Sequence, residues 1–378
     1  IARLKSFNLK SFEIKKLKNG LKKSNLLIKN LVSKHFHNLD NLNNESILLD
    51  KQYRDNFNFK SIKDLLDITE KQYILPFAHL ARGSFVSKII LKDFFNTKEI
   101  SDIVSNIETV SSIFNNDITK ISSKQFKEKY KHLVPNTYDF NNVLKNNYIR
   151  NIKNINKKNY KKINIFKILK KRIKEKDLIN IGFKNHFELF KFIKNSISGR
   201  EYAKYIFSRN IYLIFNNLRN WAEKNNIEFD YINFIDNRIF SLIYKNGLDK
   251  KFFLKQVTAS KKKYQLNLQL NLPDFINKFK DLYFFEEFES KATFIGKNCN
   301  AKIVNFSKDI SDVSIYKSKI ILIPNADPGF EFLLHLGIKG IITKYGGSNS
   351  HMAIRSNELN LTSIIGLGSN YEKIKKFK

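Results

Sequence analysis

The chain has 378 residues, 42% of them hydrophobic, and its 68 Lys and Arg residues outnumber 35 Asp and Glu residues to give a formal net charge of +33. This length predicts two or three domains with packed cores. No apolar run of about 18 residues is evident, so we expect no membrane-spanning helix and no membrane partner. The single cysteine, Cys299, excludes an intramolecular disulfide and a cysteine-based metal cluster and fits a cytoplasmic location.

Residues 1–285 are expected to form mainly helices, because few prolines or glycines interrupt them and apolar residues recur three and four positions apart. Residues 73–95 predict one amphipathic helix, with an expected buried stripe of Phe77, Leu80, Ala81, Phe85, Ile89 and Ile90. Residues 197–221 predict another, with core positions at Ile206, Leu213, Ile214 and Leu218. Composition places the linker to the next domain near residues 286–291, so that domain is expected to span 286–378.

Basic segments with nearby aromatic residues, such as 157–162 and 170–174, raise the alternative of nucleic-acid binding. Lysine, asparagine, isoleucine, phenylalanine and tyrosine are abundant along the whole chain, however, and no RNP, zinc-finger or helix-turn-helix signature accompanies the charge. A basic helical nucleic-acid-binding protein with a non-catalytic α/β tail is therefore the alternative, and nucleic acid is not an expected partner.

The last part of the chain predicts alternating strands and helices. Apolar runs at 318–323, 338–343 and 363–366 are typical of short buried strands, the first of them bounded by Pro324. Between the first two, Asp327 suits a helix cap, Pro328 the first helical position and Gly337 a left-handed stop. A second helix is expected from a cap within 348–350 to a point near residue 360. This order predicts an α/β unit.

One histidine, His351, stands at the start of that second helix, next to Ser350 and just after Gly346 and Gly347. Glycines allow positive φ and close backbone approach, and a helix start favours negative charge. A largely neutral imidazole can therefore accept a phosphoryl group here and divide one transfer into two steps. The alternatives are a polar loop histidine at position 351 and a simple helix-capping serine at position 350.

Residues 346–366 read GGSNSHMAIRSNELNLTSIIG. They resemble the signature G-G-x-x-[ST]-H-x-A-I-x-A-R-E-L of the swivelling phosphohistidine domain in phosphoenolpyruvate synthase, pyruvate phosphate dikinase and related phosphoenolpyruvate-utilising enzymes. The matching positions are Gly346, Gly347, Ser350, His351, Ala353, Ile354, Glu358 and Leu359, together with Gly366 beyond the quoted pattern. The family arginine is Asn357 here, with Arg355 two residues earlier, and the family proline is Thr362.

The resemblance implies a multidomain protein, with a mainly α-helical N-terminal region followed by an α/β (β/β/α-type) swivelling phosphohistidine domain. It implies that His351 is the catalytic residue and that Gly346, Gly347, Ser350 and Arg355 support the phosphate. Arg355 lies four residues after His351, so both can share one helix face. The alternative within the family is a domain that keeps the fold without the chemistry.

Three stretches of the helical region, 76–85, 130–139 and 198–209, loosely resemble the central part of dikinase-like proteins, including rifampicin phosphotransferases. In those enzymes the helical middle region holds the phosphoryl acceptor. The resemblance therefore implies candidate acceptor-site residues, namely Arg82, His132, Tyr138, Asp139, Arg200, Glu201 and Arg209. The alternative for each is a salt-bridged or capping residue.

The resemblance further implies phosphoryl transfer from ATP or phosphoenolpyruvate to pyruvate or another small molecule. The sequence has no Walker A motif, no recognisable nucleotide-binding domain and no metal-ligand spacing. ATP and Mg²⁺ are therefore expected on an ATP-binding domain of the same polypeptide, upstream of residue 1, and the swivelling domain is expected to be truncated at its C-terminus. Nothing resembles a phosphoenolpyruvate-binding barrel, so the domain order is similar to that of rifampicin phosphotransferases.

Overall fold

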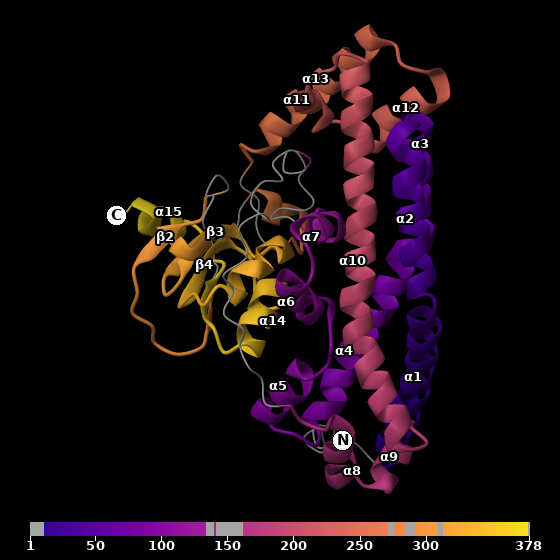
Figure 1. The fold of residues 1–378 in the computed structure, drawn as a ribbon, viewed down its shortest axis with the longest axis vertical. Helices are drawn as coiled ribbons and strands as arrows, with labels where there is room; N and C mark the ends of the chain where they lie inside the picture. Colours follow the sequence, from indigo (N-terminus) through magenta and orange to yellow (C-terminus); the bar gives the residue numbers. More distant parts are fainter. Residues whose placement is uncertain are drawn as a thin grey trace. The chain divides into compact units, whose positions relative to one another are not determined.

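The computed structural model describes residues 11–133, 140, 162–270, 276–283, 292–307 and 313–376 (Figure 1). Within these residues the chain is mostly helical as far as Leu282, and its first strand begins at Thr293. The predicted mainly helical region and the small sheet near the C-terminus are both present. The boundary predicted between residues 285 and 286 lies outside the described residues.

The chain divides into two compact units. Unit 1 comprises residues 1–50, 67–133 and 149–211, and unit 2 comprises 51–66, 134–148 and 212–378. The helices that lie wholly or largely in unit 1 are α1 (Ser11–His37), α2 (Leu39–Asp55), the π-helical η2 (Thr69–Tyr73), α4 (Ile74–Lys92), α5 (Thr97–Ser105), α6 (Val110–Lys120), α7 (Ser123–Tyr130), α8 (Ile165–Arg172), α9 (Glu175–Ile181) and α10 (His186–Lys224). Local signals begin and end several of them. Asn96 and Ser122 form capping boxes at α5 and α7, and Gly182 ends α9 with φ +95°.

Helices α1, α4 and α10 pack closely because small residues stand where their backbones meet. A Cβ at Gly83 of α4 would lie 2.4 Å from Val32 Cγ2 of α1 and 2.6 Å from Ser196 Oγ of α10. A Cβ at Gly199 of α10 would lie 2.8 Å from Phe36 Cδ2. These distances leave no room for a side chain, so the two glycines set how near the three helices approach.

The buried face of α4 differs from the expected stripe. Leu80 and Ile90 are buried, but Phe85 and Ile89 are 54% and 63% exposed. Burial falls instead on the small residues Gly83, Ser84 and Ser87. The prediction was wrong there because close helix packing selects small residues, whereas the apolar pattern favoured the large ones. Helix α10 extends the predicted helix 197–221, and Ile206, Leu213 and Ile214 are buried as expected.

One continuous helical run, Phe59–Lys92, is long and apolar enough to cross a membrane, in contrast to the expectation from sequence. This comparison considers only the length and the composition of the helix. Of its most apolar window, 39% is buried inside the protein, and a core helix of a soluble protein satisfies the same criterion.

In unit 2, aromatic residues hold several helical segments together. The ring of Trp221 on α10 lies 5.1 Å from that of Phe59, at the start of α3 (Phe59–Ile68), and 5.9 Å from that of Phe253 on α13 (Lys250–Asn267). Asp236 caps α12 (Asn237–Asn246), and Asp249 caps α13. The short α11 (Phe229–Ile232) and η5 (Phe279–Leu282) complete the described helices before the sheet.

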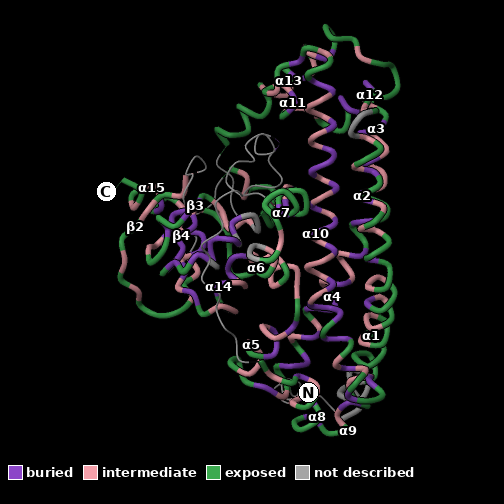
Figure 2. Tube along the Cα trace, in the orientation of Figure 1, coloured by how far each residue is buried: buried purple, intermediate pink, exposed green. Residues whose placement is uncertain are grey.

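The sheet of unit 2 has five strands in the order β1-β5-β4-β3-β2. The strands are β1 (Thr293–Ile295), β2 (Ile303–Asn305), β3 (Ile320–Asn325), β4 (Gly340–Tyr345) and β5 (Thr362–Ile365). Strands β2 to β5 pair in parallel, and β1 pairs antiparallel with β5. Figure 2 shows the buried positions gathered along β3 and β4, where Ile321, Ile323 and Ile341 are at most 1% exposed.

The three predicted strands correspond to β3, β4 and β5, while β1 and β2 were not predicted. Pro324 lies inside β3 and does not end it. The first predicted helix is a 3₁₀-helix, η7 (Pro328–His335), and Gly337 follows with φ +69°, in the predicted left-handed conformation. The second is α14 (His351–Glu358), preceded by Ser350 as its cap. A 3₁₀-helix, η6 (Val313–Tyr316), precedes β3, and α15 (Asn370–Lys376) follows β5.

Candidate functional site

The candidate site lies where the parallel strands β3, β4 and β5 end at one edge of the sheet. The loops that follow these strands are joined by backbone hydrogen bonds. The N–H of Ala326 donates to Tyr345 O at 3.1 Å, and the N–H of Leu367 donates to Thr343 O at 2.9 Å. Crevices at the carboxyl ends of parallel strands are the usual ligand sites of α/β sheets. The end of β4, from which the chain continues to His351, is thus bonded to the segments that follow β3 and β5.

Gly346 and Gly366 fit tightly against each other in this loop region. Gly346 has φ +134°, and a Cβ there would lie 2.7 Å from Ala326 Cβ and 2.9 Å from Ile365 Cγ2. Gly366 has φ +76°, and a Cβ there would lie 2.2 Å from Gly346 O. Both positions therefore require glycine.

Gly347 differs from its neighbour, because a Cβ there meets nothing within 4 Å and its φ is not in the left-handed region. Of the two glycines, Gly346 alone uses the positive φ that this residue type allows. A side chain at position 347 would therefore extend into open space.

Ser350 caps the helix that begins at His351. Its Oγ accepts a hydrogen bond from the N–H of Ala353 at 3.3 Å, and its own N–H donates to Gly347 O at 2.9 Å. Capping, one of the two predicted roles of Ser350, is therefore present. His351 is half-buried as the first residue of α14, at the end of a helix dipole that stabilises negative charge.

Arg355 lies one turn further along α14 and has a partner on the same helix. Its Nη1 lies 2.8 Å from Glu358 Oε2, and the two side chains are only 12% and 16% exposed. The guanidinium is therefore held beside a carboxylate, a contact that was not predicted from sequence.

Two further residues of this edge were missed from sequence. Thr343 is fully buried, and its Oγ1 accepts a hydrogen bond from the N–H of Gly366 at 2.9 Å. Lys344 Nζ lies 2.8 Å from Glu372 Oε1 of α15. The hydrogen bond from Lys344 lowers the pKa of Glu372. A polar residue at the end of an apolar strand was the signal that could have identified Thr343.

The candidate acceptor residues lie in the helical part, and unit 1 brings two of them together. The ring of His132 lies 4.6 Å from the ring of Tyr205, and the guanidinium of Arg209 lies 4.7 Å from the same ring. Arg209 also donates to Asn43 Oδ1 at 2.8 Å. His132 is 1% exposed, and neither of its ring nitrogens has a hydrogen-bond partner among the described residues. Burial, with Arg209 and Lys131 nearby, holds the pKa of His132 well below its usual range.

Three of the other candidates have surroundings of their own in the described residues. Glu201 accepts a hydrogen bond from Ser111 at 3.3 Å, and Arg82 contacts the ring of His79, its Nη1 3.3 Å from Nδ1. Arg200 is half-buried on α10. Tyr138 and Asp139 lie outside the described residues. In the described part of the chain, no group of three or more His, Cys, Asp or Glu side chains could hold a metal ion.

The C-terminal part thus combines parallel strands, a glycine loop and a histidine at a capped helix start. In agreement, residues 315–376 match the family model of the PEP-utilising enzyme, mobile domain. This segment contains β3, β4, β5 and α14 with His351, and it shows that the chain is related to PEP-utilising enzymes. Phosphotransfer through a phosphohistidine is the chemistry of that enzyme family. No curated protein matches the chain.

Proposed function

We propose that the chain belongs to a phosphotransferase that carries a phosphoryl group on His351 of its mobile domain. The observation that supports this most directly is the position of His351. It begins α14 at the carboxyl edge of three parallel strands, directly after the loop that Gly346 and Gly366 hold. The family match over residues 315–376 supports phosphohistidine chemistry in this domain.

The proposed reaction has two displacements. A ring nitrogen of neutral His351 attacks the phosphorus of the donor, and the new N–P bond forms as the P–O bond to the leaving group breaks. The leaving group takes the bonding electron pair. An acceptor oxygen then attacks the same phosphorus, the N–P bond breaks, and the imidazole regains its lone pair. The proton on the acceptor oxygen goes to a base.

We assign the loop residues supporting roles. The start of α14 and the Ser350 hydroxyl stabilise the phosphoryl oxygens, and the open space beside Gly347 admits them. Arg355 supplies positive charge one helical turn away. In this proposal the phosphoryl negative charge competes with the Glu358 carboxylate for the Arg355 guanidinium.

The donor in this proposal is ATP with Mg²⁺, bound by an ATP-binding domain of the same polypeptide, with phosphoenolpyruvate as the other donor considered. The acceptor is pyruvate or another small molecule, and the domain order is that of rifampicin phosphotransferases. His132 and Arg209 each contact the ring of Tyr205. We prefer these two as acceptor-site residues among the seven candidates, because a base and a cation suit an oxygen acceptor.

Labelling tests this proposal. The full-length protein is incubated with ATP labelled at the γ or β phosphate, and with labelled phosphoenolpyruvate in parallel. We expect an acid-labile, base-stable label that His351→Ala abolishes and that the matched variant His37→Ala, at an exposed helical histidine, retains. Label that persists in His351→Ala would contradict the assignment of the phosphorylated residue. Label from phosphoenolpyruvate alone would contradict ATP as the donor.

A further inference from the structure

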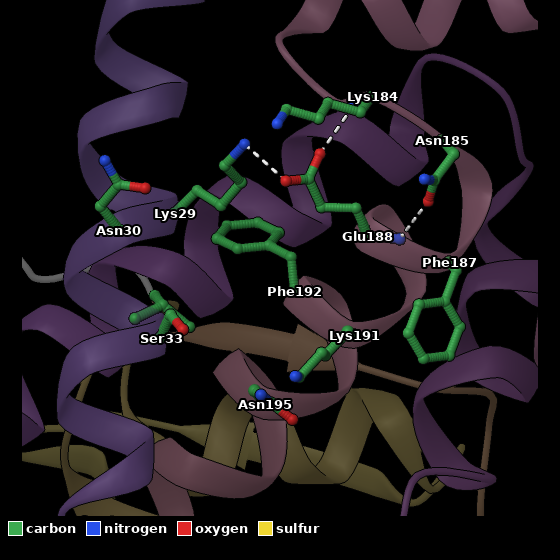
Figure 3. Close-up of a pocket in the computed structure, with 11 residues that line it drawn as sticks. Lys29, Asn30, Ser33, Lys184, Asn185, Phe187, Glu188, Lys191, Phe192 and Asn195 are labelled. Atoms are coloured by element: carbon green, nitrogen blue, oxygen red, sulfur yellow. Dashed lines mark hydrogen bonds and ion pairs between the residues drawn. The ribbon is translucent and has the colours of Figure 1, made fainter.

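A groove in unit 1 is lined by several lysine side chains and by the side-chain amide of Asn195. It lies between α1 and the beginning of α10 and has a volume of about 310 Å³ (Figure 3). Lys29 and Ser33 line it from α1, and Lys191 and Asn195 line it from α10. It belongs to one compact unit and shares no residue with the loop that carries His351.

The only acidic residue among those that line the groove, Glu188, already has partners for both carboxylate oxygens. Its Oε1 lies 2.8 Å from Lys29 Nζ, and its Oε2 accepts a hydrogen bond from the backbone N–H of Lys184 at 2.7 Å. Figure 3 shows both contacts as dashed lines. The hydrogen bonds and charges of Lys184 and Lys29 lower the pKa of Glu188 against the opposing effect of burial. Lys184 and Lys191 therefore leave about two positive charges without a carboxylate partner among the residues that line the groove.

Asn195 is the second, independent feature that points to a ligand. It lines the groove although it is only 8% exposed, and its side-chain amide makes no hydrogen bond to the described residues. The amide atoms are not fully enclosed, so they are open to the groove, where a ligand oxygen can accept a hydrogen bond from the NH₂ group. Asn195 follows Lys191 by four residues on α10, so both side chains lie on the same helix face.

The apolar part of the groove adds a preference for what is attached to the anion. The ring of Phe192 is 4% exposed, and Phe187, also in the lining, is 61% exposed. Ammonium groups bind phosphate as point charges, and an amide N–H adds a directed hydrogen bond. A phenyl or similar apolar group can cover the Phe187 ring at the same time.

We propose that this groove binds a small molecule that carries a phosphate group and an apolar or aromatic part, held by Lys184, Lys191 and Asn195. This site is separate from the phosphohistidine site. Its occupancy does not depend on phosphoryl transfer through His351.

Isothermal titration of the chain with phenyl phosphate tests the proposal. His351→Ala serves as the background for all variants, so that no covalent transfer to residue 351 contributes to the signal. Inorganic phosphate and phenol are the comparison ligands. We expect phenyl phosphate to bind more tightly than inorganic phosphate, and phenol to bind most weakly, at physiological ionic strength.

The variants separate a built site from the general positive charge of the chain. The double variant Lys184→Gln/Lys191→Gln and the single variant Asn195→Asp should each weaken phenyl phosphate binding at least about tenfold, which corresponds to about 1.4 kcal/mol. Lys170→Gln/Lys176→Gln removes the same charge from exposed positions of α8 and α9 and should change the affinity less than about twofold. Thermal unfolding of each variant checks its fold.

Equal losses in the two double variants would overturn the proposal in favour of unspecific attraction. Absence of phenyl phosphate binding at millimolar concentrations would overturn it as well. Neither outcome bears on the labelling of His351, so the two proposals can fail independently.

Discussion

Arg355 and Glu358 form a largely buried ion pair on the helix that begins at His351, with 2.8 Å between Nη1 and Oε2. The exposed fractions of the two side chains are 12% and 16%. A guanidinium placed in this way has a structural role before any phosphoryl group arrives. Its role in the chemistry must therefore be measured apart from its role in the fold.

Arg355→Ala is expected to lower both the stability of the fold and the rate of phosphoryl transfer. Glu358, which is mostly buried, loses its contact with Arg355, which should lower the free energy of unfolding by about 1–3 kcal/mol. Loss of a charge-assisted hydrogen bond to the phosphoryl group should slow transfer roughly ten- to a hundred-fold. Arg355→Lys should rescue only in part, because lysine keeps the charge without the planar fork. Rapid-quench measurement of label on His351 gives the rates.

Glu358→Gln is the matched control for this pair. It keeps the side-chain shape and leaves Arg355 available, so transfer should remain within a few-fold of the parent protein. Transfer that is unchanged in Arg355→Ala would assign the arginine to the ion pair alone.

Glycine substitutions should separate tight packing from open space in the loop. Gly366→Ala brings a Cβ to within 2.2 Å of Gly346 O at φ +76° and is expected to lower the free energy of unfolding by more than about 2 kcal/mol. Gly347→Ala meets nothing within 4 Å and should change stability by less than about 0.5 kcal/mol. Urea denaturation compares the two. A stable Gly347→Ala protein with slowed transfer would indicate that the phosphoryl group occupies the space next to position 347.

Substitution by alanine should have opposite effects on stability at Gly83, where α1, α4 and α10 approach closely, and at Gly20. Gly83→Ala places a Cβ 2.4 Å from Val32 Cγ2 and should cost about 1–3 kcal/mol through overpacking. Gly20→Ala in α1 meets nothing within 4 Å and should add up to about 1 kcal/mol through helix propensity. Thermal and urea unfolding report both changes. Stabilisation by Gly83→Ala would contradict the packing described for these helices.

Because His132 is buried, we predict that the free energy of unfolding depends on pH. Burial keeps its pKa in the folded protein well below the ordinary value of 6.5. The unfolded chain therefore binds a proton that the folded chain does not. The free energy of unfolding should fall as the pH drops below about 6.5, by up to about 1.36 kcal/mol per pH unit, and level off below the folded pKa.

His132→Phe tests this dependence because it keeps a ring against Tyr205 and removes the two buried nitrogens. We expect a shallower slope between pH 5 and 6.5 and no loss of stability near pH 7. The pKa values of His35 and His79 are also lowered, mainly by partial burial, so part of the slope should remain. His37→Phe, at an exposed position, provides the comparison. An identical slope in His132→Phe would show that His132 does not contribute.

Much of the candidate site could be predicted from sequence because its residues are close together in the chain. The Ser350 cap and the helix start at His351 depend on interactions over a few residues, and each of the three strands around it carries a local apolar run. Short-range patterns of capping, turn formation and apolar periodicity capture such interactions. The three-residue strands β1 and β2 are too short to carry a periodic pattern, and they form only against β5 and β3.

The sequence by itself therefore determined the α/β order of the C-terminal part, the position of His351 at a helix start and the family of its domain. Tertiary structure alone decided the contact of Gly366 with Gly346, the Arg355–Glu358 pair, the small-residue face of α4 and the meeting of His132 with Arg209. The sequence offered more apolar and charged positions than one buried face or one ion pair requires. Which of them are buried or paired depends on the close packing of segments that are distant in the chain.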